Sequence, residues 1–551
     1  MKWLYVLTTC LVAFVQAANA QFSIDGQKAV YDSLTNTYMA TVPQSVFHHD
    51  HEAMIGLDAG WYEIFIDYQK TANKTFRFKQ IEANKNYPVT LISNTGERYY
   101  AQLTFTFLPI VQLKGNFSND YTPATVRFAD PYVAGCETLH AQVKWRGGTT
   151  NGPDRHKRNY KIKLDDDYAF LGMRNDNNWI LDAGQKDLFR FRNLMANDLW
   201  SDFVRQPYYI DEEPKARLSI RGAVVEVFLN NAYAGLYNLS ENIDRKQAKV
   251  KKIDKDTGAV RGCLYKAKGW LNSRMYNPVT PYDNSSETWD AFEVKYPDLA
   301  DSDTTDWSTL CEAIAFVHDS NNSIFFKQVA DYFDLPIVAD YWVFGSVLNP
   351  LDNAGKNVFW AVHDKNIDRK LTLAVWDLDC CMGQRWQGEI SERLARPDTI
   401  VDMKMRLTDR LVRNNLEGFN DDVNARYAEA ARGIFAADSL IARVNHYYAL
   451  MDHSGARLRE EQRWSGDSDI AGEILNIEAE KDYICDWITQ HIRMINTTRY
   501  AEALDIRQHF ADADDSSATV YDLRGRRFSA DEPLAPGIYI KNHRKVVIKR
   551  P

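Results

Sequence analysis

The segment Asn349-Pro350-Leu351-Asp352-Asn353-Ala354-Gly355-Lys356-Asn357, followed further along the chain by Trp376-Asp377-Leu378-Asp379, decides the fold that this sequence predicts. Apolar spacing over residues 335–348 predicts a helix directly before the first segment, and residues 371–376 predict a strand that leads into the second. The first segment therefore places an Asp and an Asn on a loop, and the second places two Asp residues at a strand end. This order of elements is more specific than either segment alone.

These residue types suit the transfer of a phosphoryl group to a hydroxyl. That reaction needs a carboxylate beside the incoming oxygen, oxygen ligands for Mg²⁺, and a cation on the leaving phosphates. Asp352 and Asn357 have the spacing of the catalytic loop of protein kinases, and a kinase holds its metal-binding Asp at a strand end before a glycine, as Asp377 precedes Gly383. Each piece alone also has an ordinary explanation as a turn or a cap.

The flanking sequence divides into a mixed part and a helical part. Residues 132–300 predict an α+β lobe, with helical spacing over 187–203 and strand patterns at 139–145, 159–164 and 224–229. Residues 301–510 predict a mainly α lobe, because helical spacing is nearly continuous over 402–504 and includes the Ala-rich run 426–437.

The N-terminal part differs from this centre. Lys2, the apolar run at 3–15 and the small residues Ala18-Asn19-Ala20 predict a cleaved signal peptide over residues 1–20, and hence a secreted or cell-surface protein exported across the inner membrane. Alternation with period two over 21–131 predicts a β-sandwich domain. Within it, His48-His49-Asp50-His51-Glu52 forms either a metal site or, by default, a solvated loop.

Composition limits the remaining function classes. A chain of 551 residues predicts several domains, and after the signal no stretch has the roughly 20 apolar residues of a transmembrane helix. A net charge of −9 argues against nucleic acid as the partner. The six cysteines beyond the signal lack C-x-x-C spacing, so they define neither a zinc site nor a redox site.

Several blocks in order resemble the CotH-like (spore coat protein H) family of atypical protein kinases over roughly 130–500. Besides the two segments quoted first, the blocks are Trp145-Arg146-Gly147-Gly148, Asn159-Tyr160-Lys161-Ile162-Lys163-Leu164, Trp179-Ile180-Leu181-Asp182-Ala183 with Arg192-Asn193, the run 233–244, and Lys295-Tyr296-Pro297. The resemblance implies a two-lobed protein-kinase-like domain over 132–510. It also implies ATP, Mg²⁺ or Mn²⁺, and a protein substrate phosphorylated on Ser or Thr.

The resemblance assigns roles to individual positions. Asp352 matches the catalytic Asp that orients or deprotonates the acceptor hydroxyl. Asn357 matches the metal-binding Asn, and Asp377 is the expected principal Mg²⁺ ligand, with Asp379 next to it. The remaining candidates would bind the cofactor, namely Lys163, Lys161, Arg146 and Glu241.

For these four cofactor positions, alternatives stay open. Lys163 is expected on the α- and β-phosphates, and Lys161 faces the same side of its strand. The glycine-bearing turn after Arg146 either approaches phosphates through backbone N–H groups or is a plain hairpin. Glu241 lies either near the lobe junction or at a strand end as an anchor.

The last part of the chain predicts a separate small β module over 518–551, after an acidic linker at 511–517. Its runs at 520–526, 536–540 and 545–549 resemble the C-terminal sorting domain of the type IX secretion route of Bacteroidetes, and the alternative is a small β-hairpin cap.

An exported kinase meets little ATP, which leaves a second class of function open. The alternative is a catalytically silent, kinase-like protein of the cell surface that binds a partner through its β-rich domain. The complete acidic set favours the enzyme. A third class, a glycoside hydrolase with Asp377 and Asp379 as its carboxyl pair, would leave Asn357 and Lys163 without a role. The oligomeric state is left open.

Overall fold

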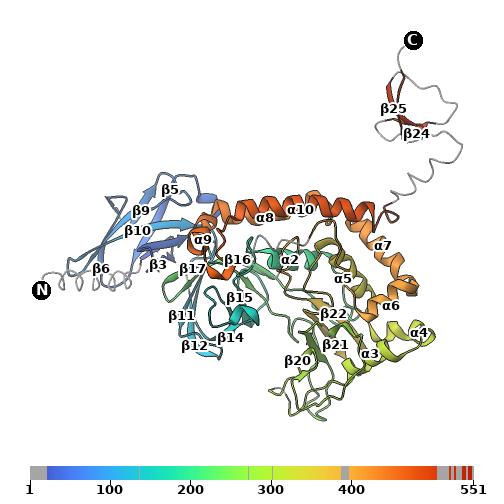
Figure 1. Ribbon diagram of the computed structural model, residues 1–551. Coiled ribbons are helices and arrows are strands. Elements are labelled where there is room, and N and C mark those ends of the chain that lie inside the picture. The colour runs from blue at the N-terminus through green and yellow to red at the C-terminus, as the bar shows by residue number, and fades with distance from the viewer. Residues whose placement is uncertain are drawn as a thin grey trace.

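The structure is a computed structural model (Figure 1), in which residues 22–504 are described apart from 73, 136, 271, 301 and 386–395. Four strands beyond residue 519 are also described. The predicted signal peptide over 1–20, the acidic linker at 511–517 and the remaining parts of the C-terminal module lie outside the described residues.

The chain begins with two β-sheets that pack on each other. One sheet has the order β2 (Gln27–Lys28), β1 (Phe22–Ile24), β5 (His51–Leu57), β8 (Thr75–Phe78). The other has the order β3 (Val30–Asp32), β4 (Thr37–Thr41), β10 (Arg98–Thr106), β9 (Tyr87–Ser93), β6 (Trp61–Ile66), β7 (Gln69–Lys70). Aromatic rings from both sheets meet between them, as in Phe22 with Tyr38 at 4.9 Å and Phe78 with Phe105 at 5.1 Å between ring centroids. The alternating pattern thus buries one face of each sheet.

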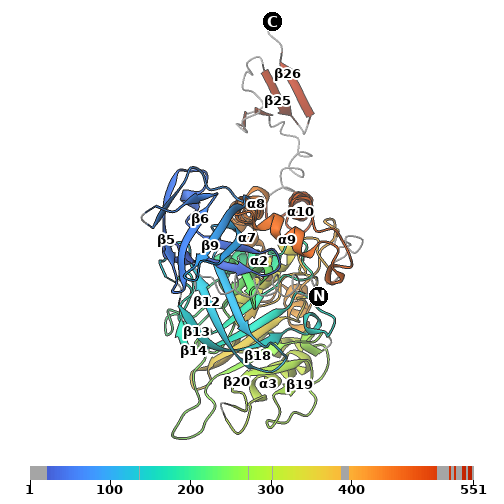
Figure 2. The ribbon, with the colours of Figure 1, turned by 90° about the vertical axis from the view of Figure 1, so that its left-hand side faces the viewer.

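The next strands close into a barrel below the sandwich (Figure 2). Its order is β11 (Ile110–Gly115), β12 (Thr122–Ala129), β13 (Thr138–Arg146), β14 (Asn159–Tyr168), β15 (Asp176–Asp182), β17 (Ala232–Ser240), β16 (Gly222–Leu229). The parallel pair of β11 with β16 closes it. By strand pairing, therefore, the sandwich ends near residue 108 and not at the expected 131, because β11 and β12 bond to barrel strands.

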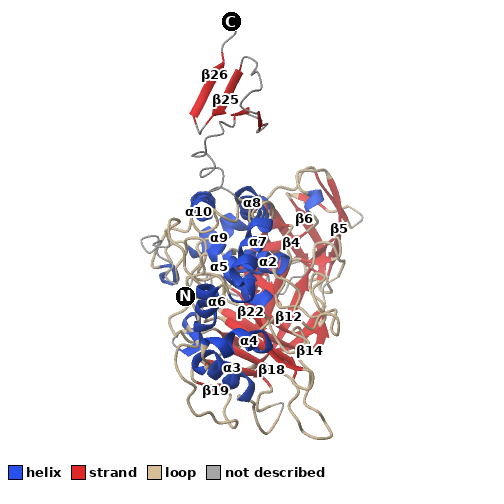
Figure 3. Cartoon of the chain, turned by 90° about the vertical axis from the view of Figure 1, so that its right-hand side faces the viewer, coloured by secondary structure: helices blue, strands red, loops and turns tan. Residues whose placement is uncertain are grey.

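A third sheet and the helices follow. The sheet has the order β19 (Thr288–Trp289), β20 (Phe292–Tyr296), β18 (Cys263–Ala267), β21 (Val358–Asp364), β22 (Asp368–Val375). The α-helices are α2 (Arg192–Phe203), α3 (Ser308–Asp319), α4 (Asn322–Tyr332), α5 (Leu335–Leu348), α6 (Arg406–Asn414), α7 (Phe419–Ala430), α8 (Ala437–His453), α9 (Ala456–Trp464) and α10 (Ile477–Thr497). In Figure 3 these helices gather on one side of the molecule and the sandwich and barrel strands on the other.

The predicted order, a multidomain chain that is strand-rich first and helical later, is confirmed. Two details of the helical part differ. The first residues of the predicted helix 187–203 form a turn in which Asp187 accepts from the amide of Arg192 at 2.7 Å, so α2 begins only at Arg192. The Ala-rich run 426–437 spans the end of α7 and a turn around Gly433.

The C-terminal segments form a small antiparallel sheet of order β24 (Arg527–Phe528), β23 (Val520–Asp522), β25 (Gly537–Lys541), β26 (Arg544–Ile548). Across the described parts of the chain, no helix combines the length and apolar character needed to cross a membrane.

Candidate functional site

The loop after α5 and the segment after β22 lie side by side, joined by backbone hydrogen bonds. Helix α5 ends at Asn349, which adopts the left-handed conformation at φ 54°. Beyond it, the amide of Leu351 donates to the carbonyl of Cys380 at 2.9 Å, and the amide of Trp376 donates to the carbonyl of Asn357 at 2.9 Å. These bonds hold residues 349–357 against residues 376–380, so the two segments that the sequence singled out meet in space.

Asp352 is the centre of a short hydrogen-bonded group on this loop. Its Oδ2 accepts from Asn357 Nδ2 at 2.9 Å and from Lys356 Nζ at 2.6 Å. Burial raises the pKa of Asp352, and the negative charge of Asp377 adds to that increase. Hydrogen bonds from Lys356 and Asn357, and the charge of Lys356, oppose it. Because the amide nitrogen of Asn357 faces Asp352, its side-chain carbonyl oxygen remains as a ligand atom.

The aspartates after β22 have different surroundings. Asp377 is exposed and has a positive φ of 58°. Asp379 is half-buried, and burial together with the charges of Asp377 and Asp182 raises its pKa well above the ordinary value. Carboxylates gathered closely enough for their negative charges to raise the pKa of one of them are typical of a site that binds a cation.

A third acidic residue, Asp182, belongs to this group although it was assigned no role from the sequence. It lies at the end of β15, where burial raises its pKa despite hydrogen bonds from Asn193 Nδ2 at 2.7 Å and the amide of Gly184 at 3.2 Å. Asn193 Oδ1 in turn accepts from the amide of Leu378 at 3.0 Å. Its place at a strand end, within a block that carried the resemblance, is the signal that could have identified it.

A small cavity of about 20 Å³ lies between these groups. Its polar lining comes from Arg146, Asn159, Asp182, Asn193, Ser240 and Asp377. That volume accommodates about one water-sized species.

Arg146 ends β13 and lies opposite the aspartates. Its guanidinium carbon is 5.4 Å from the centre of the Trp376 ring. Burial lowers the pKa of Arg146, and the charges of Asp182 and Asp377 counteract that shift. The turn after it contains Gly147 at φ 109° and a short 3₁₀ segment at Thr149–Asn151.

Of the two lysines predicted on β14, the structure brings Lys161 to this cluster. Lys161 is half-buried, and burial together with the charges of Arg146 and Lys295 lowers its pKa to about 8. Lys163 is exposed and forms no ion pair with any described residue.

Lys266, which the sequence did not single out, joins the same cluster from β18. Burial lowers the pKa of Lys266, the charge of Asp377 raises it, and Arg146 lowers it further.

Glu241 lies apart from these side chains. Its Oε1 accepts from Arg217 Nη2 at 2.9 Å and from the amide of Arg174 at 3.1 Å, and its Oε2 accepts from the amide of Arg221 at 3.0 Å. Burial would raise the pKa of Glu241, but these donors outweigh burial and lower it. The carboxylate therefore fixes the loops around the end of β17.

Residues 48–52 form a turn that leads into the start of β5, and two of these residues make ion pairs. His51 Nε2 lies 2.6 Å from Asp25 Oδ2, and Asp50 binds Arg77. Within the described ranges, no group of three or more His, Cys, Asp or Glu side chains is arranged to hold a metal by itself.

The residues nevertheless fit Mg²⁺ bound together with phosphates. Proteins commonly hold Mg²⁺ through one or two carboxylates, with substrate phosphates and water completing the shell. Asp377 is exposed at a strand end, Asn357 offers an amide oxygen, and the raised pKa of Asp379 reports a concentration of negative charge that a divalent cation would relieve.

Comparison with known proteins places this site in a family. No curated protein matches the chain. One solved structure, titled "A Trimodular GH5_4 Subfamily Endoglucanase Structure with Large Unit Cell", is 10% identical with a TM-score of 0.12, over 29% of this chain and 35% of that one, and so carries no argument. The model of the family described as CotH kinase protein matches residues 143–495, which include every candidate site residue. The chain therefore belongs to the CotH kinase protein family.

Proposed function

We propose that this protein is an ATP- and Mg²⁺-dependent kinase that phosphorylates Ser or Thr hydroxyls of a protein. The observation that carries the proposal is the hydrogen bond between Asp352 and Asn357 on a loop that is bonded to the segment holding Asp377. Arg146 and Lys266 supply positive charge near Asp377, and Lys161 lies next to Arg146. A carboxylate base, oxygen ligands and cations for phosphates are the parts that phosphoryl transfer needs.

Asp352 would orient the acceptor hydroxyl and take its proton. In this step the acceptor oxygen forms a bond to the γ-phosphorus while the bond from that phosphorus to the β–γ bridging oxygen breaks, leaving ADP. The raised pKa of Asp352 suits it to accept a proton, and Lys356 and Asn357 hold its carboxylate in place. When bound, Mg²⁺ or Mn²⁺ would neutralise phosphate charge, held by Asp377 and Asn357 with Asp379 beside them.

The contributing elements support a two-lobed arrangement. Arg146, Lys161 and Asp182 come from the barrel, whereas Lys266, Asn357 and Asp377 come from the ends of strands in the five-stranded sheet. We propose that the barrel with α2 forms one lobe, that the five-stranded sheet with the later helices forms the other, and that nucleotide binds between them.

The site of action is part of the proposal. The signal-like residues 1–20 and the β module at the C-terminus support export to the cell surface, by a route that uses a type IX-like sorting domain in a bacterium of the Bacteroidetes. The protein substrate or cell-surface partner would then be met during or after export, with ATP supplied locally.

The test is transfer of labelled phosphate from γ-labelled ATP to a generic protein acceptor or to the protein itself, with Mg²⁺ or Mn²⁺. We expect Asp352→Asn to lower kcat by about 100-fold or more, since it removes the base. Asp377→Asn should raise the Mg²⁺ concentration needed for half-maximal rate. The matched control is Asp166→Asn, an exposed aspartate on β14 that should leave both values unchanged.

Absence of transfer under all of these conditions would overturn the proposal. It would instead favour a catalytically silent binding protein that keeps the fold. Thermal melting with ATP plus Mg²⁺ separates the two cases further, because a silent protein that has also lost nucleotide binding gives no shift.

A further inference from the structure

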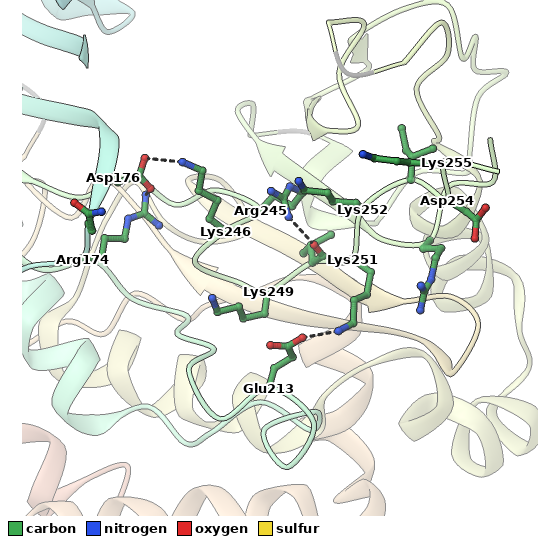
Figure 4. Close-up of a pocket in the computed structure, with 14 residues that line it drawn as sticks. Arg174, Asp176, Glu213, Arg245, Lys246, Lys249, Lys251, Lys252, Asp254 and Lys255 are labelled. Atoms are coloured by element: carbon green, nitrogen blue, oxygen red, sulfur yellow. Dashed lines mark hydrogen bonds and ion pairs between the residues drawn. The ribbon is translucent and has the colours of Figure 1, made fainter. Parts of the chain in front are cut away.

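A pocket of about 750 Å³ is strongly basic (Figure 4). It is lined by Arg174 to Asp176, Glu213, Arg245, Lys246, the run 249–255, and Arg261, and is called the basic pocket below. Eight of its lining residues are Lys or Arg and three are Asp or Glu. This excess of positive charge stands out on a chain whose net charge is −9.

The three acidic side chains of the basic pocket are already occupied. Asp176 pairs with Arg174 at 3.0 Å and with Lys246 at 3.1 Å. Glu213 pairs with Lys251, as the dashed line in Figure 4 shows. Asp254 accepts hydrogen bonds from the amides of Asp256 and Thr257 in its own turn.

Four of the cations, in contrast, have no carboxylate partner within 4.0 Å among the described residues. They are Arg245, Lys249, Lys252 and Lys255, all from one loop between the barrel and β18. Lys252 and Lys255 are exposed. Gathering like charges in one depression is unfavourable unless an anion offsets them, and such a depression raises the local concentration of anionic ligands.

Two sets of contacts connect the lining of the basic pocket with residues near the candidate active site. Arg174 binds Asp244 at 2.7 Å, and Asp244 is close enough to Lys161 for its charge to oppose the lowering of that lysine's pKa. Arg245 lies 5.4 Å from the ring centre of Tyr296, the last residue of β20, and the neighbouring Lys295 acts on Lys161 and Lys266. An extended chain bound in the pocket could therefore reach the phosphotransfer site.

We propose that the basic pocket binds an acidic segment of the protein that carries the phosphoacceptor hydroxyl. The proposal rests on the kinase function proposed above and names the substrate class. Among polyanions, an acidic peptide fits better than nucleic acid, because the positive charge is confined to one compact pocket on a chain of negative net charge.

The first experiment measures binding without catalysis. The full-length protein is titrated into a fluorescent peptide of about eight Asp and Glu residues that lacks Ser and Thr, at low and at high NaCl, and anisotropy is read. We expect affinity that falls with salt and that falls about 10-fold in Lys252→Glu/Lys255→Glu. The control Lys79→Glu/Lys327→Glu makes the same change of charge at exposed lysines elsewhere and should stay within about 2-fold of the unchanged protein.

The second experiment measures transfer. Two acceptor peptides share one Ser, flanked in one by an acidic tract and in the other by the matching Asn and Gln residues. The double variant at 252 and 255 should raise KM for the acidic acceptor alone and leave kcat and the KM for ATP unchanged.

Each outcome decides one proposal. Transfer with no preference for the acidic acceptor, or equal losses in the test and control variants, would overturn the basic pocket as a docking site and leave the kinase intact. Peptide binding without any transfer would contradict the kinase alone. If an oligonucleotide of equal charge binds more tightly than the peptide, and its binding is lost in the same variant, the pocket is assigned to nucleic acid instead.

Discussion

Lys161 and Lys163 lie on the same side of β14, opposite its buried side chains, yet their surroundings differ sharply. Lys161 lies half-buried beside Arg146 with a pKa lowered to about 8, whereas Lys163 is exposed. Strand periodicity predicts that both lysines face one side of the strand, but not how far neighbouring elements cover that side. The residue that can respond to phosphate charge is therefore Lys161.

We predict a pH dependence of ATP binding that arises from Lys161. With a pKa of about 8 in the free protein, Lys161 is charged below that pH and loses its charge as pH rises through it, earlier than an ordinary lysine. Phosphates favour the charged form, so the Kd for ATP should rise above pH 8. In Lys161→Arg this rise should be absent, because arginine stays charged.

Isothermal titration calorimetry with ATP, from about pH 7 to pH 9.5, measures this Kd. Lys163→Arg is the matched control, in which the Kd should still rise above pH 8. A flat profile in the unchanged protein would show that Lys161 does not face the phosphates.

At the scale of elements, the sequence predicted correctly those helices, loops and strands that depend on residues close together along the chain. Helix α5, its loop and β22 appeared as expected, because apolar spacing and the turn residues act locally. Asp182 and Lys266 were not identified as site residues, since they reach the site only through tertiary structure. Asp182 comes from the barrel strand β15, and Lys266 from β18, which pairs with β21. The strand pairing of β11 and the turn that splits 426–437 likewise depend on tertiary contacts that periodicity does not encode.

Helix α9 is fixed to the barrel by a buried charge cluster that we predict to be essential for stability. Glu460 Oε1 accepts from Lys157 Nζ at 2.7 Å and Arg190 Nε at 2.8 Å, and its Oε2 accepts from the amide of Leu236 at 2.8 Å. Glu460→Gln would leave two buried cations without a counter-charge and should cost about 3–5 kcal/mol of the free energy of unfolding.

Urea unfolding followed by tryptophan fluorescence measures that loss. Glu478→Gln, at an exposed position in the first turn of α10, is the control and should change the free energy of unfolding by less than about 1 kcal/mol. Equal effects of the two substitutions would show that the cluster contributes no more than a surface charge.

At the scale of the whole molecule, the sandwich and the barrel are joined by a shared buried cluster, although the barrel also has an interior of its own. Phe228 and Tyr233 of the barrel hairpin pack with Val30 and Met39 of the sandwich in one buried cluster. The amide of Tyr233 donates to Asp32 Oδ1 at 3.0 Å, across the same junction. The main hydrophobic core likewise runs from sandwich residues into the helices without a break. Such continuity couples the unfolding of the parts.

We therefore predict a single cooperative thermal transition for residues 22–504 in scanning calorimetry, including when the sandwich alone is weakened. Phe105→Ala removes a fully buried ring from the sandwich core, costs about 3–5 kcal/mol and should lower the Tm of the whole transition by about 3–5 °C. Tyr100→Ala, on the same strand but 65% exposed, should leave the Tm nearly unchanged. If Phe105→Ala instead splits off an early transition while the remainder melts as before, the sandwich is an independent domain and the shared core does not couple it to the kinase-like part.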